Sequence, residues 1–244
     1  MNLSIIKFIK QFHFKKLDST SSFLKRHYKE LSNLTFVRCD YQTSGHGRYG
    51  RAWESDKSKN LMFSFLIKDK RIIDKYDSLS LATAVSVYNS LKKIGLNNLS
   101  IKWPNDVYLN SKKISGILLE GCSYSNSIDS IVIGVGINLN QQTFIDNNAT
   151  SYILETNKSI SINKFKRIIY KEIRVMINNL LVGDNSYLNI IRSNNYLLNK
   201  EVFATINDKQ EKVIVLGIND DNSIKIQSKD GIFNLTTGEI TFHS

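Results

Sequence analysis

The apolar pattern of this 244-residue chain changes near residue 199, and that change limits the folds available to it. Before residue 199, apolar runs of strand length alternate with segments whose apolar residues recur at helical spacing. After it, five short apolar runs are separated by turn residues such as Asp230-Gly231. The pattern predicts an α+β chain with a separate small β unit. We therefore expect two domains, residues 1–198 and 199–244.

The larger domain is expected to be a mixed β-sheet with helices packed on one face. Ser19 or Thr20 can cap its first helix. Helices are predicted at 20–31, 79–94, 164–181 and 187–198, and strands at 34–39, 60–67, 99–103, 107–109, 114–120 and 128–138. In the smaller domain, strands at 202–206, 212–218, 223–227, 232–235 and 239–242 predict a small β-barrel.

Composition favours a soluble, cytoplasmic protein. The two cysteines, Cys39 and Cys122, are too few and too far apart to predict a disulfide framework or a metal-ligand cluster. No run of about twenty apolar residues could cross a membrane. The lysine-rich N-terminal segment lacks the apolar core and cleavage site of a signal peptide. We expect reduced thiols, no metal cage built by the protein and no membrane contact.

The net charge of +11 leaves two interpretations open. Residues 199–244 hold five lysines and seven acidic residues, a net of −2, so residues 1–198 carry +13. This surplus is spread over lysines among asparagines and isoleucines, which is typical of proteins from AT-rich genomes. It also fits a basic rim that attracts anionic partners. Charge alone therefore does not predict nucleic-acid binding.

Residues 45–53, GHGRYGRAW, place three of the twelve glycines between basic residues. Glycine lets the backbone approach an anion closely, and arginine supplies charge-assisted donors that match phosphate or carboxylate. Arg48 and Arg51 are therefore candidate anion ligands. A tight surface turn with incidental arginines is the alternative, because a lone Gly-x-Gly is a weak signal.

Two further motifs follow the glycine segment. Residues 102–106, KWPND, contain the only proline and place Asn105 and Asp106 in a loop at the end of a strand. Residues 112–118, KKISGIL, predict a turn and a strand in which Gly116 leaves an opening beside Lys113. Each motif alone is typical of a strand end or a solvated surface. Together with the glycine segment they predict one site for anions.

These motifs, with residues 17–20 (LDST), 41–42 (YQ) and 135–138 (VGIN), occur in the order and approximate spacing of biotin protein ligases. The chain resembles that family over nearly its whole length. The resemblance implies a sheet of the biotin ligase and class II aminoacyl-tRNA synthetase type, followed by an SH3-like β-barrel. It also implies an ATP-dependent enzyme that activates biotin as biotinyl-5'-AMP, transfers it to a carrier-protein lysine, and releases pyrophosphate and AMP.

The resemblance implies roles for the charged residues. Biotin and ATP are both anions, so their site must neutralise repulsion and align the reacting atoms. Lys113 is expected to reach the biotin carboxyl and the α-phosphate, and Arg48 to fold over the intermediate. The implied ATP-binding set is Arg48, Arg51, Trp53 stacked on adenine, Lys102, Asn105, Lys113 and Asn138 at an adenine edge. Mg²⁺ is expected with ATP, bridging phosphate oxygens and keeping several waters.

Biotin needs a largely apolar slot with a few polar contacts to its ureido ring. The implied biotin-binding set is Ser19, Thr20, Gln42, Gly45, His46, Arg48, Lys113, Gly116, Gly134 and Gly136. Two alternatives stay open. Ser19 and Thr20 also fit a helix cap, and Gly134 and Gly136 also fit close packing.

His46 departs from the family pattern, in which many relatives have a second arginine. Histidine changes its charge near neutral pH, whereas arginine does not. If His46 contacts the anionic intermediate, retention of that intermediate should weaken as pH rises. The alternative is that His46 supports the loop through a neutral hydrogen bond.

The second half-reaction requires an acceptor lysine to lose a proton, and Asp106 is the candidate to orient or accept it. The implied acceptor is the biotin carboxyl carrier protein of acetyl-CoA carboxylase, and a homodimer is compatible with the chain. Because LDST begins at residue 17, we expect no helix-turn-helix module and no specific DNA binding. A lipoate or related acyl ligase and a non-catalytic biotin-sensing or DNA-binding protein remain alternatives.

Overall fold

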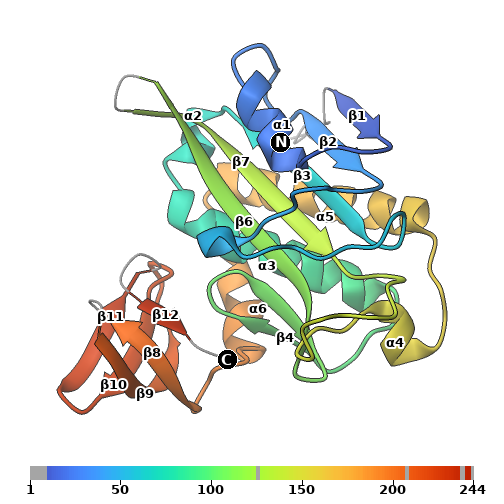
Figure 1. The fold of residues 1–244 in the computed structure, drawn as a ribbon. Coiled ribbons are helices and arrows are strands. Elements are labelled where there is room, and N and C mark those ends of the chain that lie inside the picture. Colours follow the sequence, from blue (N-terminus) through green and yellow to red (C-terminus); the bar gives the residue numbers. More distant parts are fainter. Residues whose placement is uncertain (1–9, 125–126, 207–208, 237–239, 243–244) are drawn as a thin grey trace.

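Two β-sheets, with helices packed around the larger one, make up this computed structural model (Figure 1). It describes residues 10–124, 127–206, 209–236 and 240–242. The larger sheet has seven strands in the order β1-β2-β3-β7-β6-β5-β4. Their bounds are Gln11–Phe14 (β1), Phe36–Cys39 (β2), Leu61–Ile67 (β3), Leu99–Lys102 (β4), Asp106–Leu109 (β5), Lys112–Tyr124 (β6) and Ser127–Ile137 (β7). Strand β1 runs parallel to β2 and the other pairs are antiparallel, so the predicted mixed sheet is confirmed.

The helices are short except for two. They are α1 (Thr20–His27), α2 (Lys70–Ile73), α3 (Tyr76–Lys93), α4 (Tyr152–Thr156), α5 (Ile162–Leu181) and α6 (Tyr187–Ser193). The two long helices, α3 and α5, pack against each other and against one face of the sheet (Figure 1). Phe36 stacks on Phe63 with 4.7 Å between ring centroids. The ring centroid of Tyr170, in α5, lies 3.6 Å from that of Phe36.

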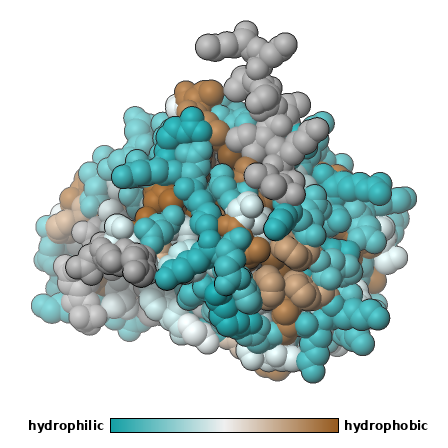
Figure 2. Space-filling view, turned by 90° about the horizontal axis from the view of Figure 1, so that it is seen from above, coloured by the Kyte–Doolittle hydropathy of each residue, from teal (hydrophilic) through white to brown (hydrophobic). Residues whose placement is uncertain are grey.

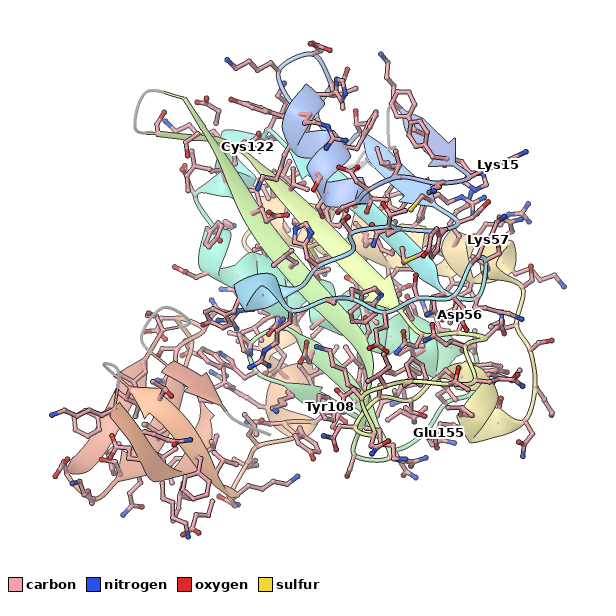
Figure 3. All side chains as sticks on the ribbon, in the orientation of Figure 1. Lys15, Asp56, Lys57, Tyr108, Cys122 and Glu155 are labelled. Atoms are coloured by element: carbon pink, nitrogen blue, oxygen red, sulfur yellow. The ribbon has the colours of Figure 1, made fainter. Side chains whose placement is uncertain are left out.

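Helix α1 lies on the opposite face of the sheet. Because successive strand residues point to opposite faces, Val37 and Leu66 face away from the long helices and pack with Leu24 of α1. Cys122, labelled in Figure 3, belongs to the same buried cluster. The predicted single helical face therefore holds for α3 and α5, and α1 is the exception.

The smaller sheet has five antiparallel strands in the order β11-β10-β9-β8-β12. Their bounds are Glu201–Ile206 (β8), Lys209–Ile218 (β9), Ile224–Ser228 (β10), Gly231–Leu235 (β11) and Ile240–Phe242 (β12). The predicted C-terminal β unit is confirmed, although residue 239 lies outside the described residues. The turn before β10 contacts the turn between β4 and β5 and helix α6, since Asn222 O accepts from Trp103 Nε1 at 3.1 Å and Asn222 Oδ1 accepts from Tyr187 OH at 2.7 Å.

Several short elements differ from the sequence-based predictions. Helix α6 ends at Ser193 instead of residue 198, because Ile101 N donates to Asn194 O and Tyr196 N donates to Ile101 O. These bonds join residues 194–196 to the edge strand β4. Strand β1 and helices α2 and α4 were not predicted, since four or five residues are too few for a periodic signal.

The molecular surface is mixed in character. On the face in Figure 2, hydrophilic residues predominate and hydrophobic residues form small separate patches. Among the described residues, no helix combines the length and the apolar composition needed to span a membrane.

Candidate active site

A cavity of about 280 Å³ gathers almost all of the residues selected from the sequence. Its walls come from the start of α1, the glycine segment 45–53, the turn between β4 and β5, and strands β6 and β7. Every predicted site residue except Gly45 lines this cavity. Motifs that are separate in the sequence therefore share one space.

The glycine segment forms a small hairpin over the cavity. Gly47 N donates to Arg51 O at 2.8 Å, and Trp53 N donates to Gly45 O at 2.9 Å. Its tip is a single 3₁₀ turn, η1 (Arg48–Gly50), in which Gly50 has φ 70°. That left-handed backbone explains the glycine at this position. The hairpin presents Arg48 to the cavity at its tip.

One end of the cavity, here called the hydroxyl end, consists of Thr20, Ser21, Gln42 and Ser64. Thr20 donates to Gln42 Oε1 from its backbone N at 2.8 Å and from Oγ1 at 3.1 Å. The Ser64 hydroxyl lies 2.7 Å from Thr20 Oγ1 and 2.9 Å from Ser21 Oγ. Because each hydroxyl has one proton, the chain runs from Ser21 through Ser64 and Thr20 to Gln42. The hydroxyl end is neutral and internally satisfied.

Two residues of the hydroxyl end, Ser21 and Ser64, were missed in the sequence. Ser64 is the one polar residue in the fully buried strand β3, and a buried hydroxyl normally has a hydrogen-bond partner. That break in an apolar run was the available signal. Ser19, by contrast, accepts from Ser22 N at 3.4 Å and caps α1, in addition to lining the cavity.

Gly45 supports the hydroxyl end from behind. A Cβ at Gly45 would lie 2.7 Å from Gln42 Nε2. Gly45 does not line the cavity itself but makes room for the Gln42 side chain, and its place in the biotin-binding set stays a prediction.

The other end, here called the cationic end, contains Arg48, Arg51, Lys102 and Lys113. Lys113 Nζ pairs with Asp106 Oδ1 at 2.8 Å. Lys102 forms no ion pair within the described part of the chain. Burial lowers the pKa of Lys102, and Lys113 and Arg51 lower it further, against an opposing effect of Asp106. This end therefore holds an excess of positive charge.

Asn105 joins the hairpin tip to the sheet. Its amide Nδ2 donates to Ile117 O at 2.8 Å, which directs Oδ1 toward Arg48 Nη1 at 3.4 Å. Arg48 also donates to the hydroxyl of Tyr49 at 3.0 Å. Asn105 and Tyr49 therefore both help to hold the Arg48 side chain at the tip.

Trp53 lies against the strands at the base of the cavity. A Cβ at Gly136 would lie 2.3 Å from Trp53 Cε2, and one at Gly116 would lie 3.1 Å from both Trp53 Cζ3 and Lys113 Cε. A Cβ at Gly134 would lie 2.6 Å from Ser21 Oγ. All three glycines line the cavity as predicted, but their missing side chains leave space that Trp53, Lys113 and Ser21 occupy.

Two buried polar atoms of the site, Trp53 Nε1 and Asn138 Oδ1, have neither a hydrogen-bond nor an ion-pair partner among the described residues. The amide nitrogen of Asn138 donates to Thr150 O at 3.0 Å, which fixes the direction of Oδ1. An unsatisfied buried donor or acceptor costs roughly 1–3 kcal/mol. Both atoms are therefore available for a ligand that offers the complementary group.

His46 interacts with the protein on both sides of its ring. Nδ1 lies 3.2 Å from Ser44 O, so it donates to that carbonyl, and Nε2 lies 3.6 Å from Glu120 Oε2. Glu120 also pairs with Lys25 Nζ at 2.7 Å. Glu120 was not selected from the sequence, because it belongs to none of the motifs. These contacts favour loop support over direct contact with an anion.

A loop after β7 completes the wall around Lys113. Lys113 N donates to Asn148 O at 2.7 Å, and Thr150 N donates to Lys113 O at 2.9 Å. Residues 144, 146, 148 and 149 line the cavity on this side. None of these residues was selected from the sequence, since the loop carries no recognisable motif.

Comparisons with known proteins agree with this geometry. Residues 13–138 match the biotin/lipoate A/B protein ligase family. The bifunctional ligase/repressor BirA of Escherichia coli is 28% identical over 233 residues, which span 93% of this chain and 72% of the relative. BirA of Bacillus subtilis is 37% identical over 108 residues, 44% of this chain and 33% of that protein.

A solved structure extends the likeness to the whole fold. The biotin protein ligase of Aquifex aeolicus, in complex with biotin and ATP, has a TM-score of 0.85 and 29% sequence identity. The match covers 97% of this chain and 99% of the Aquifex chain. The predicted fold class is confirmed by this similarity.

Proposed function

This chain belongs to the biotin/lipoate A/B protein ligase family, and we propose that it activates biotin with ATP and attaches it to a carrier protein. The main support for this proposal is that one cavity joins a neutral hydroxyl end to a cationic end. Such a cavity suits an uncharged polar ring whose carboxylate must meet a triphosphate. The ligase of Paracoccus denitrificans, named biotin–[acetyl-CoA-carboxylase] ligase, is 32% identical over 129 residues.

Activation follows from the charges around Lys113. The biotin carboxylate attacks the α-phosphorus of ATP, forms the biotinyl-5'-AMP anhydride and releases pyrophosphate. The Lys113 ammonium, 2.8 Å from Asp106 in the structure, would turn to the carboxylate and the α-phosphate. Lys102 and Arg51 would neutralise the triphosphate. Fixed cations of this kind lower the barrier by stabilising charge without reorganisation.

The hydroxyl end would recognise the biotin ring. Thr20, Ser21 and Ser64 present hydroxyl groups linked in one direction, and Gln42 anchors the chain. A ureido group offers both donors and an acceptor, so it can bond to such hydroxyls without any charge. Ser19, next to this chain, lines the same cavity.

The adenine would meet the two unsatisfied atoms of the site. Asn138 Oδ1 is a buried acceptor that can bond to the exocyclic amine of adenine. Trp53 Nε1 is a buried donor, and the indole supplies a flat apolar face. Stacking of adenine on Trp53 is the arrangement that we propose.

Magnesium is proposed to accompany ATP. Among the described residues there is no group of three or more His, Cys, Asp or Glu side chains able to form a cage. The carboxylates of Asp106 and Asp146 at the cavity wall would hold the cation from the protein side, and phosphate oxygens and waters would supply its other ligands. Bound in this way, magnesium would add positive charge at the triphosphate.

Transfer completes the reaction. The acceptor lysine amine attacks the anhydride carbonyl, the amide bond forms, and AMP leaves. Asp106 would orient the incoming amine or accept its proton once Lys113 has turned to the substrates. Arg48, at the hairpin tip, would retain the intermediate until the acceptor arrives. The acceptor that we propose is the biotin carboxyl carrier protein of acetyl-CoA carboxylase.

The remaining proposals concern organisation. We divide the chain into a catalytic domain, 1–198, and a β-barrel domain, 199–244. Cytoplasmic location, a homodimer and the lack of specific DNA binding are retained as predictions. A mobility-shift assay with the organism's own biotin-operon promoter at physiological salt tests the last of these.

The experiment that tests the function is an adenylation assay. The purified protein is incubated with ATP, magnesium and either biotin or lipoic acid, and the acyl-adenylate is identified by mass spectrometry. We expect biotinyl-5'-AMP and its transfer to a carrier domain. Formation of the lipoyl product alone would assign the chain to the lipoate ligases.

A further inference from the structure

Lys102 and Lys113 lie in the same cavity but are held differently. Lys113 Nζ is paired with Asp106 Oδ1 at 2.8 Å, and it also lies 5.8 Å from the centroid of the Trp53 ring. Lys102 has no carboxylate partner among the described residues, and its Nζ lies 5.5 Å from the centroid of the Tyr108 ring. An ammonium within about 6 Å of an aromatic centroid is attracted by the ring quadrupole.

The register of β4 and β5 brings the two side chains together. Lys102 is opposite Asp106, and Ser100 is opposite Tyr108, so Lys102 and Tyr108 are diagonal neighbours on one face. Diagonal neighbours across two strands are within reach of long and aromatic side chains. Tyr108, labelled in Figure 3, lines the cavity from β5 and was not selected in the sequence.

A second tyrosine fixes the ring of Tyr108. Tyr196 stacks on it at 4.5 Å between centroids with an interplanar angle of 28°. Tyr196 is held in turn by its backbone bond to Ile101 of β4, at 2.9 Å, and by Lys200, whose Nζ lies 3.5 Å from the Tyr196 centroid. Tyr108 is only 6% exposed. Its ring therefore has little freedom to move away from Lys102.

An aromatic ring and a carboxylate have different consequences for a cation that must bind phosphate. A carboxylate neutralises the ammonium and repels the incoming anion, whereas a neutral ring directs the ammonium and leaves its charge available. Burial raises the pKa of the Tyr108 phenol, so the ring stays neutral at physiological pH. Its hydroxyl makes no hydrogen bond to any described residue. The face of the Tyr108 ring, and not its hydroxyl, is therefore the group that contacts the Lys102 ammonium.

We propose that Tyr108 is a positioning residue that holds the Lys102 ammonium toward the triphosphate of ATP through its ring face. This inference rests on the proposed function, because it assumes that the cationic end binds ATP. It assigns to Tyr108 a role in nucleotide affinity through Lys102. Simple packing of a buried tyrosine is the competing explanation.

A double-mutant cycle separates the two explanations. The dissociation constant for ATP is measured by calorimetry, without biotin, for the wild type, Tyr108→Leu, Lys102→Met and the double variant. Tyr108→Phe is the matched control, since it keeps the ring and loses only the unbonded hydroxyl. Thermal unfolding of each variant checks the fold, and Tyr108→Met replaces the leucine variant if that one does not fold.

We expect Tyr108→Leu to weaken ATP binding about five- to thirtyfold, the range of a desolvated cation–π contact. Tyr108→Phe should stay within about twofold of the wild type, because it retains the ring face. In the Lys102→Met background, loss of the ring should have no further effect. An equal loss with and without Lys102, an unchanged affinity in Tyr108→Leu, or a phenylalanine variant as weak as the leucine variant would overturn the proposal.

The adenylation product is analysed in parallel, so that the two proposals fail separately. If the protein forms biotinyl-5'-AMP but the effects of the Tyr108 and Lys102 substitutions on ATP affinity are independent, only the role of Tyr108 is overturned. Coupled variants in a protein that forms no biotinyl-5'-AMP would overturn the proposed function and leave the Tyr108–Lys102 contact in place.

Discussion

The hydroxyl end and the cationic end of the cavity differ in how far their polar groups are satisfied by the protein itself. At the hydroxyl end, Ser21, Ser64, Thr20 and Gln42 form one continuous chain of hydrogen bonds. At the cationic end, Lys102 has no acidic partner among the described residues. Nearby, Trp53 Nε1 and Asn138 Oδ1 are buried and have no hydrogen-bond partner in the described part of the chain.

This difference indicates which step of the reaction each end would affect. A preformed neutral chain should recognise a polar ring with little rearrangement, so its loss should act mainly on KM for that substrate. A cluster of incompletely compensated cations is stabilised only when anions arrive. Loss of Lys113, the cation of this end that is proposed to lie between the two reacting anions, should therefore act mainly on the chemical step, where charge is redistributed. Substitutions at the two ends test this contrast.

The largest effect is expected from Lys113→Ala. It removes the cation between two reacting anions and leaves Asp106 uncompensated, so formation of biotinyl-5'-AMP should fall by on the order of 10³-fold or more. Pyrophosphate release and the circular dichroism spectrum are measured together. Lys112→Ala, an exposed neighbour, is the matched control and should remain active. Pyrophosphate release at the wild-type rate would remove Lys113 from the mechanism.

A smaller and different effect is expected from Gln42→Ala. The substitution leaves the backbone N and the hydroxyl of Thr20 without their acceptor, at roughly 1–3 kcal/mol. KM for biotin should rise about ten- to hundredfold, with kcat and KM for ATP little changed. Thr43→Ala, at the adjacent exposed position, serves as the control. A loss in kcat without a change in KM would contradict the contrast between the two ends.

Arg48→Gly should change selectivity more than rate. Arg48 reaches the cavity from the hairpin tip and is anchored by Asn105 and Tyr49. Without it, we expect activated biotin to escape and to label bystander lysines severalfold more than the wild type does, as one closing group is lost. Labelling of a mixture of unrelated proteins is compared with that by Arg48→Lys. Equal selectivity of the wild type and Arg48→Gly would refute the retaining role.

The site residues that lie in sequence motifs were predicted well. Arg48, Lys102 and Lys113 were selected because basic residues beside glycine, or at a strand end, suit anions, and the structure places all three on one cavity. The long helices and central strands were also predicted, since their apolar periods are unambiguous. Contacts formed by short segments were not.

The missed residues share a physical reason. Tyr108 and Glu120 act through neighbours on other strands or loops, and such pairings depend on register and topology. Ser64 left a weak trace as a polar residue in a buried strand. For His46 the sequence left two roles open, contact with an anion and support of the loop, and the structure places its ring beside Ser44 and Glu120. Local sequence reports the type of a side chain better than its partners.

The smallest effect is expected in the pH dependence of ATP binding. Burial lowers the pKa of Lys102 below its ordinary value of 10.5, and the nearby cations Lys113 and Arg51 add to this. A bound triphosphate would favour the protonated form, so affinity should be complete below the lowered pKa and decline as pH rises through it. The decline is at most about tenfold per pH unit for one proton.

Lys102→Arg should show a smaller decline, because arginine keeps its charge. Dissociation constants for ATP between pH 7 and 10 are compared for the two proteins. A steeper curve for the wild type supports Lys102 as the cation at the phosphates, and parallel curves would place that charge on another residue.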